Sequence, residues 1–171
     1  MNDVPYEKPS RHAEKASILI ERKEVVMKEQ GYQSSFTAHI SPREALEEIS
    51  RVPEWWGKDF EGKSQELNDV FTVRFPGGDR YQAKVAEIQP DTKIIWEFID
   101  AYQGWVKNPT EWVGTKIIWE VTPPKEGVKV KMTHVGLVPE LECFDTCSHG
   151  WQYLMQESLF KFLNEGKGHP A

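Results

Sequence analysis

The stretch GWQYLMQESLFKFL, residues 150–163, spaces its apolar side chains as one face of an α-helix. Steps of three and four residues bring a side chain back to the same side of a helix. Cys147 and Cys143 continue this face toward the N-terminus, and Gly166 is a typical helix stop. We therefore expect a long amphipathic helix whose first turn lies between residues 142 and 148 and whose apolar face needs a partner surface. That face carries Trp151, Leu154, Met155, Leu159, Phe162 and Leu163.

A different pattern, with period two, runs from about residue 62 to residue 136 and is typical of β-strands. Turn signals separate the strands at Gly77–Gly78, at Pro90–Asp91 and at PPKEG, and a looser segment covers 101–112. We expect a meander of about six antiparallel strands, each with one apolar face. The faces are Phe71, Val73 and Phe75; Tyr81, Ala83, Val85 and Glu87; Ile94, Trp96 and Phe98; Val113, Ile117, Trp119 and Val121; and Val128, Val130, Met132 and His134.

The first sixty residues supply the remaining elements. Residues 1–10 look like a loose arm, and 11–30 favour a helix, with a strand at 17–20 as the alternative. A strand is expected over 32–40. The next segment, SPREALEEIS, begins a helix well, because Ser41 is a good N-cap and Pro42 fits the first helical position. Pro53 ends that helix, and EWWGKDF predicts a second short helical turn.

These elements predict an α+β fold. A sheet with one apolar face must cover that face, and the C-terminal helix is the long element available to do so. We therefore expect a curved antiparallel sheet of about six to seven strands wrapped around the C-terminal helix. The two short helices after the first strand should close one end of the sheet.

Three segments then resemble a known family. VPEWWGKDFEG is similar to the second-helix region of the START-like, or polyketide-cyclase-like, superfamily, and KVAEIQPDTKIIWEF to its strand–Pro–strand–Trp region. CFDTCSHGWQYLMQESLFKFLNEGKGHP resembles the final helix of the branch named for the activator of heat-shock-protein-90 ATPase. The resemblance covers about 33–171 and implies a helix-grip domain over 32–171, preceded by an N-terminal extension over 1–31.

The chain departs from that branch in two ways. It carries no counterpart of the N-terminal co-chaperone domain, so ATPase activation does not carry over with the resemblance. In addition, the segment 101–112, with Trp105 and Trp112, is longer than usual and lies where it could reshape the mouth of a pocket.

The resemblance implies a cavity between sheet and helix that holds a small apolar molecule, because the superfamily includes lipid and hormone binders as well as cyclases and dehydratases. Fold alone does not choose among these roles. Seven tryptophans suit either an aromatic-lined pocket or a solid aromatic core. The side chains expected to contact the ligand are Trp56, Phe71, Val73, Tyr81, Val85, Trp96, Phe98, Trp119, Met132, His134, Cys147, Trp151 and Met155.

Candidates for proton transfer in this cavity are His134, Glu87 and Tyr81, although no catalytic residue is assigned. A histidine on an apolar strand face is more often a core residue with satisfied hydrogen bonds than a general base. A carboxylate such as Glu87 faces a core only when it is paired, and it otherwise lies at a strand end in water. Sequence motifs of serine hydrolases, zinc peptidases, phosphate loops and dinucleotide-binding folds are absent.

Cys143 and Cys147 are four residues apart, so one helical face presents both. They could form half of a zinc site, but zinc normally takes four ligands, and small buried residues are the expected role. A redox pair is a weaker alternative, because this helical spacing fits a disulfide badly. We therefore expect no metal and no cofactor.

Composition limits the partners. The net charge of −6 and the pI near 5.4 argue against nucleic acid, because no surplus of basic residues exists to bind phosphates. No apolar run reaches the length of a membrane span, and the N-terminal sequence lacks the layout of a signal peptide. A cytoplasmic location is the expectation.

Three functions stay open at this point. The first is a binder of a small apolar, lipid-like ligand. The second is an enzyme of the cyclase or dehydratase kind that uses the same pocket. The third is a chaperone-associated interaction module, with a chaperone or a second copy of the chain as its partner. Polar groups within hydrogen-bond distance inside a cavity favour the enzyme, an apolar cavity favours the binder, and a filled interior with an exposed apolar patch favours the module.

Overall fold

The computed structural model describes residues 10–28, 30–123 and 125–171. The chain forms two compact units, Met1–Gln30 and Gly31–Ala171. The first contains helix α1, Arg11–Lys28, in which residues 11–19 are exposed to solvent. The loose arm expected over residues 1–10 lies almost entirely outside the described residues. The strand considered at 17–20 is part of this helix.

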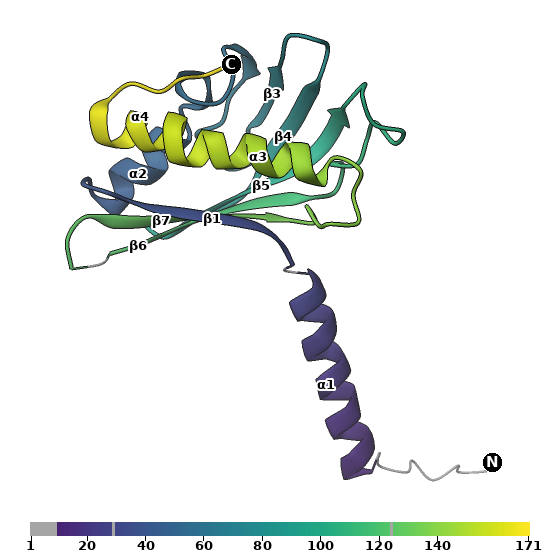
Figure 1. Ribbon diagram of the computed structural model, residues 1–171. Helices are drawn as coiled ribbons and strands as arrows, with labels where there is room; N and C mark the ends of the chain where they lie inside the picture. The colour runs from purple at the N-terminus through teal and green to yellow at the C-terminus, as the bar shows by residue number, and fades with distance from the viewer. Residues whose placement is uncertain (1–9, 29, 124) are drawn as a thin grey trace. The chain divides into compact units, whose positions relative to one another are not determined.

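The second unit contains an antiparallel sheet of seven strands among the described residues, in the order β1-β7-β6-β5-β4-β3-β2. Figure 1 shows how the sheet bends, so that β3 and β4 stand across the direction of β1 and β7. The first strand therefore pairs with the last, and the meander expected from the sequence fills the rest of the sheet. The strands are β1 Gly31–Ala38, β2 Asp59–Gly62, β3 Val70–Arg74, β4 Arg80–Gln89, β5 Lys93–Tyr102, β6 Lys116–Thr122 and β7 Val128–Val135.

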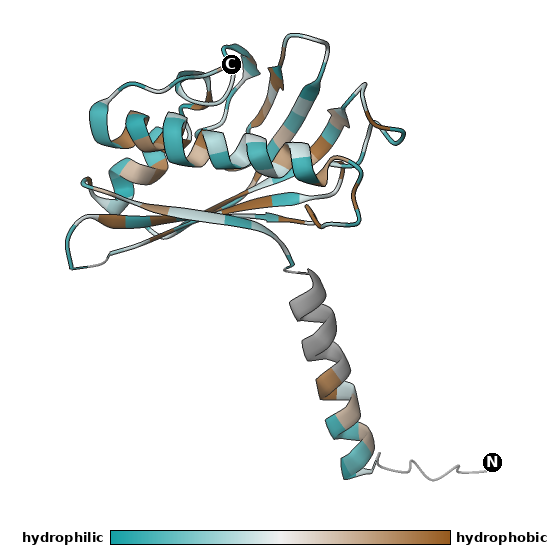
Figure 2. Cartoon of the chain, viewed as in Figure 1, coloured by the Kyte–Doolittle hydropathy of each residue, from teal (hydrophilic) through white to brown (hydrophobic). Residues whose placement is uncertain are grey.

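The C-terminal helix lies in the concave side of this sheet (Figure 1). It consists of α3, Phe144–Tyr153, a π-helical turn η2, Leu154–Leu159, and α4, Phe160–Glu165, and it ends at Gly166 with a positive φ of 75°. The outward side of this helix is largely hydrophilic (Figure 2). Five of the six apolar residues predicted for its inner face are buried, and the sixth, Leu154, is half-buried. The α+β helix-grip fold predicted from the sequence is therefore confirmed.

The two short helices after β1 close one end of the sheet. Helix α2, Pro42–Ile49, begins with a capping box, in which Ser41 and Glu44 each accept a hydrogen bond from the other's backbone N–H. A short 3₁₀ turn η1, Val52–Glu54, follows it. This turn begins two residues earlier than EWWGKDF predicted, because Pro53 favours the start of a helix as well as the end of one.

One further detail of the pattern is corrected by the structure. Val113 was expected on the buried face that begins β6, but its side chain is 45% exposed. The strand begins only at Lys116, and Val113 belongs to a turn whose backbone bonds to Thr110. Ile117, Trp119 and Val121 are buried as predicted.

Candidate functional site

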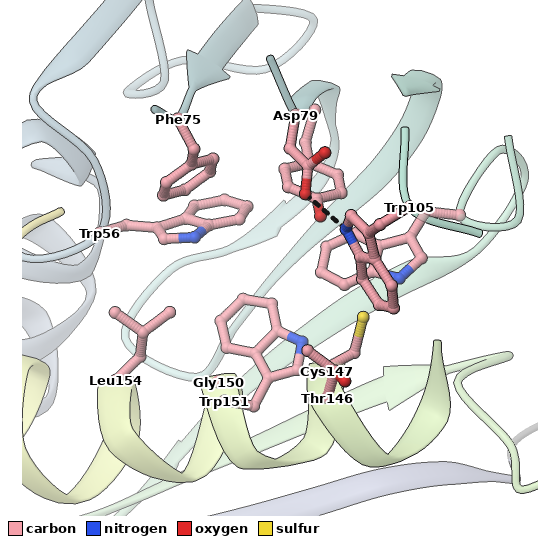
Figure 3. Close-up of a pocket in the computed structure, with 11 residues that line it drawn as sticks. Trp56, Phe75, Asp79, Trp105, Thr146, Cys147, Gly150, Trp151 and Leu154 are labelled. Atoms are coloured by element: carbon pink, nitrogen blue, oxygen red, sulfur yellow. Dashed lines mark hydrogen bonds between the residues drawn. The ribbon is translucent and has the colours of Figure 1, made fainter. Parts of the chain in front are cut away.

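A pocket of about 290 Å³ lies beside α3, at the end of the sheet where the loop between β5 and β6 crosses it. Figure 3 shows side chains from the helix below and from the sheet and loops above converging on this space. Apolar and aromatic atoms make up most of the wall. The lining residues are Trp56, Phe75, Asp79, Tyr81, Trp105, Trp112, Thr146, Cys147, Gly150, Trp151 and Leu154.

The helical wall follows directly from the period of α3. Thr146, Gly150 and Leu154 are spaced four residues apart along one edge, and Cys147 and Trp151 form the neighbouring row. Gly150 leaves a gap in this wall, because a Cβ built on it would have no heavy atom within 4 Å. The helix therefore supplies one large ring, one thiol and one recess.

Aromatic rings form the opposite walls. Tyr81 and Trp112 pack with ring centroids 4.2 Å apart, and Trp56 lies 5.3 Å from Trp151. Trp112 also lies parallel to Trp151, at 6.0 Å and an interplanar angle of 10°. Neighbouring Trp55 is fully buried, and its indole N–H bonds to the carbonyl oxygen of Ile49. The two adjacent tryptophans are thus divided as the sequence suggested, one in the core and one at the pocket.

The mouth of the pocket is formed by the loop between β5 and β6. Trp105, which is 46% exposed, donates its indole N–H to Asp79 Oδ2 at 2.7 Å. The backbone N–H of Gly104 also bonds to Asp79 Oδ1, at 3.2 Å. One carboxylate therefore ties this loop to the β3–β4 hairpin, and Figure 3 shows its bond to Trp105. The segment 101–112, expected near the pocket mouth, thus contributes two tryptophans to the pocket wall.

One buried amide connects two pocket residues. Gln103 is fully buried, and its Nε2 donates to the Tyr81 hydroxyl at 3.0 Å and to Cys147 Sγ at 3.2 Å. Burial raises the pKa of Tyr81, so its hydroxyl stays protonated and its hydrogen is available to a ligand. Five buried side-chain polar atoms have no hydrogen-bond partner among the described residues: Trp96 Nε1, Gln103 Oε1, Trp112 Nε1, Trp119 Nε1 and Ser148 Oγ.

The two cysteines are free thiols, and both are buried. The Cys143 S–H donates to the sulfur of Cys147 and thereby lowers the pKa of Cys147. Burial raises this pKa, and the hydrogen bond from the Gln103 amide lowers it further. The same pairing raises the pKa of Cys143, with burial adding to the effect. The Gln103 amide donates to Cys147, the cysteine that lines the pocket, and this bond favours negative charge on that sulfur. The described residues contain no cluster of three or more side chains suited to hold a metal ion.

His134 is fully buried behind the pocket and does not line it. The Trp151 indole N–H donates to His134 Nδ1 at 3.0 Å, so the ring carries its proton on Nε2, which lies 2.8 Å from Thr115 Oγ1. Thr115 in turn donates to the carbonyl oxygen of Trp112 at 2.7 Å. Burial lowers the pKa of His134 to about 3. This geometry matches a satisfied core histidine rather than a proton shuttle.

Glu87 does not share the buried face of β4, contrary to the alternation in the sequence. The pairing of β4 with β5 shifts between Val85 and Glu87, where a β-bulge inserts one extra residue. Ile88 therefore packs toward the core, and Glu87 turns to solvent. There Gln89 and Lys93 bond to its carboxylate and lower its pKa. Glu87 therefore lies in water at the strand end, the alternative that the sequence left open.

The structure brings four of the thirteen predicted ligand contacts to the pocket: Trp56, Tyr81, Cys147 and Trp151. The other nine are buried at 0–1% exposure and do not line this pocket. Trp96 and Trp119, for example, pack edge to face at 5.4 Å. Those nine are Phe71, Val73, Val85, Trp96, Phe98, Trp119, Met132, His134 and Met155.

The predicted ligand contacts omitted Phe75 and Leu154, which lie on predicted apolar faces, and Trp105 and Trp112, which the sequence placed near the pocket mouth. Gln103, Asp79, Thr146 and Gly150 were missed altogether. Gln103 and Asp79 lie in a loop and a hairpin, where no periodic pattern indicates which way a side chain points. Thr146 and Gly150 are one helical turn apart, and their position next to Cys147 and Trp151 was the signal that could have found them. None of the described helices is long and apolar enough to span a membrane.

No family model and no curated protein matches the sequence. Among solved structures, the Aha1 dimer from Colwellia psychrerythraea is similar, with a TM-score of 0.66 and 21% identity over 81% of this chain and 99% of the other. Protein SSP2350 from Staphylococcus saprophyticus has a TM-score of 0.61 and 12% identity over 82% of this chain and 96% of its own. DynU16, a protein of the dynemicin biosynthetic locus, has a TM-score of 0.60 and 16% identity over 80% of this chain and 48% of its own.

Structural similarity at such low sequence identity shows the fold but does not identify the activity. The fold is the one that the three sequence segments indicated. The chain therefore has the α+β helix-grip fold, in the arrangement it shares with the Colwellia Aha1 protein.

Proposed function

We propose that this protein binds a small, flat, mainly apolar molecule in the pocket beside α3. The observation that carries the proposal is the aromatic wall: Trp56, Tyr81, Trp112 and Trp151 surround a space of about 290 Å³. Small-molecule sites are typically apolar hollows near this size that contain a few well-placed polar groups. The Tyr81 hydroxyl lines this space and stays protonated, so it can donate a hydrogen bond to an oxygen atom on such a molecule.

The binder is favoured over a cyclase or dehydratase of the proton-transfer type. Such an enzyme needs a group in the pocket that gains and loses a proton near neutral pH. His134 is buried behind the wall with both ring nitrogens occupied, Glu87 lies in solvent, and the pKa of Tyr81 is raised. The pocket residues therefore support recognition of a ligand better than acid–base turnover.

Gly150 offers a direct test, because it lines the pocket on the surface of α3 without crowding. Gly150→Phe should fill the recess and weaken the binding of 1-anilinonaphthalene-8-sulfonate about 10-fold or more, measured by fluorescence titration. Gly150→Ala is the matched control. It should retain binding and stabilise the helix by up to about 1 kcal/mol. Equal dye affinity in the wild type and Gly150→Phe would contradict a ligand site here.

A second candidate function is self-association. Three large apolar side chains of β5 and the following loop are 43–45% exposed: Ile99, Tyr102 and Val113. Apolar side chains exposed along one strand and the loop that follows it are candidates for a protein interface. The similar Aha1 protein was described as a dimer. We therefore propose a homodimer through this region, and no feature of the described residues points to a chaperone as the partner.

Native mass spectrometry tests this proposal. The wild type should give a mass of twice 19.8 kDa, and the double variant Ile99→Lys, Val113→Lys should give 19.8 kDa. The pocket is unchanged in that variant, so it should still take up the dye. A wild-type protein that stays monomeric at micromolar concentration would rule out the dimer without affecting the ligand site.

A further inference from the structure

The pocket beside α3 contains one charged side chain, and that side chain is negative. Asp79 lies among the eleven described residues that line the space, and none of these eleven is a lysine, an arginine or a histidine. Two basic residues nearby add no free positive charge. Arg80 is paired with Asp100 at 2.7 Å, and His134, behind the wall, is neutral above about pH 3. The walls therefore present a net negative charge to a bound molecule.

The β5–β6 loop fixes Asp79 in place without neutralising it. Trp105 Nε1 donates to Oδ2 at 2.7 Å, and the backbone N–H of Gly104 donates to Oδ1 at 3.2 Å. Both donors are uncharged groups, and Asp79 belongs to none of the ion pairs found among the described residues. An ionised carboxylate has about four acceptor sites, so about two remain for a ligand.

Six aromatic residues line the same space as this carboxylate. The face of an aromatic ring carries partial negative charge and attracts a cation that lies within about 6 Å of its centre. Figure 3 shows Trp56 and Phe75 on one side of the space, Trp105 on the other and Trp151 on the helix below. Trp105 also donates its N–H to an anion, which increases the electron density of its ring. The rings and the carboxylate therefore both favour a positively charged ligand.

Tyr81 responds to the same negative field. Burial is the main cause of its raised pKa, and negative charge at Cys147 and at Asp79 raises this pKa further. Asp79 therefore lies close enough to the inner part of the pocket to act on a group there. A field that opposes negative charge on the Tyr81 oxygen favours positive charge on a bound molecule.

We propose that the pocket selects flat organic cations, such as an aromatic ring system with a positively charged nitrogen, over neutral molecules of the same shape. The flat apolar skeleton packs against the aromatic walls, and the charge lies near Asp79 and the ring faces. The net charge of −6 also attracts such a molecule from solution. This inference rests on the proposed ligand-binding role of the pocket and adds the charge of the ligand.

The test compares 1-methylquinolinium with 1-methylnaphthalene, which have the same shape and differ by one positive charge. Isothermal titration calorimetry on the full chain gives the two affinities, and the cation should bind at least about 10-fold more tightly. Asp79→Asn keeps the size of the side chain and should weaken cation binding about 10-fold, with less than about a 3-fold change for the neutral compound. Glu165→Gln is the matched control, because it changes the net charge by the same amount at the exposed end of α4. It should leave both affinities within about 2-fold of the wild type.

Two further measurements separate the ring from the carboxylate. Trp105→Leu keeps an apolar side chain at the mouth, removes the aromatic face and should weaken the cation more than the neutral compound. The anionic dye 1-anilinonaphthalene-8-sulfonate should respond in the opposite direction and bind Asp79→Asn more tightly than the wild type. Circular dichroism checks that each variant is folded.

The neutral compound separates this inference from the proposed function. Equal affinities of the wild type for the two compounds, or cation binding unchanged by Asp79→Asn, would overturn the charge preference and leave the pocket as a ligand site. Cation binding that stays unchanged in Gly150→Phe would place the cation outside this pocket and overturn the inference as well. If neither compound binds, both the ligand site and the charge preference fail.

Discussion

Replacement of Trp151 by Ala is expected to lower the free energy of unfolding by about 3–5 kcal/mol. The indole is 2% exposed and contacts Trp56, Trp112, Trp119 and His134 in the centre of the domain. Its removal leaves a large hole between helix and sheet. It also removes the donor to His134 Nδ1, and an unsatisfied buried acceptor costs about 1–3 kcal/mol in its own right. The loss should therefore lie near the upper end of this range.

Urea denaturation followed by circular dichroism measures this loss. Tyr153→Ala is the matched control, because Tyr153 is on the same helix, is 51% exposed and does not line the pocket. It should change stability by no more than about 0.5 kcal/mol. A loss below about 1 kcal/mol for Trp151→Ala, with altered dye uptake, would mean that the side chain borders a void and supports little of the core.

The second large effect is a loss of stability in acid that comes from His134. The pKa of the buried ring is about 3 in the folded protein, against an ordinary value of 6.5. Between these two values the unfolded chain binds a proton that the folded protein excludes. Stability therefore falls as the pH is lowered from about 6.5 toward 3, at up to about 1.4 kcal/mol per pH unit. The full contribution, about 5 kcal/mol, is present above pH 6.5 and is lost below pH 3.

His134→Gln isolates this contribution, because glutamine does not titrate. Unfolding free energies measured in urea between pH 4 and 7 should rise more steeply with pH in the wild type than in the variant. The slopes should differ by roughly 1 kcal/mol per pH unit near pH 5. The other four histidines and all carboxylates are common to both proteins and cancel in the comparison. Parallel slopes would show that His134 can be protonated in the folded state.

Much of the fold was predictable because it depends on local periodicity. The alternation in β5 places Ile94, Trp96 and Phe98 inside, and the helical spacing of 150–163 places its apolar residues toward the sheet, as the structure confirms. The start of α2 at Ser41 and the end of α4 at Gly166 also follow from local chemistry, namely a side-chain cap and a left-handed residue. Such signals act over a few residues, so they can be read directly from the sequence.

The predictions of which side chains are buried failed where a single residue interrupts the alternation of a strand. The bulge after Val85 shifts the face of β4 by one residue, so Glu87 turns outward although strict alternation places it inside. Whether a strand contains a bulge depends on its partner strand, and no signal in YQAKVAEI indicates it. Val113 was misplaced for a related reason, since the turn before β6 is held by backbone bonds to other parts of the loop.

The sequence by itself determined the helix-grip architecture, because amphipathic period, turn residues and caps together allow few ways to bury the apolar faces. Only the tertiary structure decided the candidate site. The pocket joins Trp56, Tyr81, Trp112 and Cys147 from four separate segments, and Gln103 links two of them from within a loop that has no period. Which aromatic rings fill the core and which border a space depends on how large side chains from distant segments pack together, and that packing exists only in the folded chain.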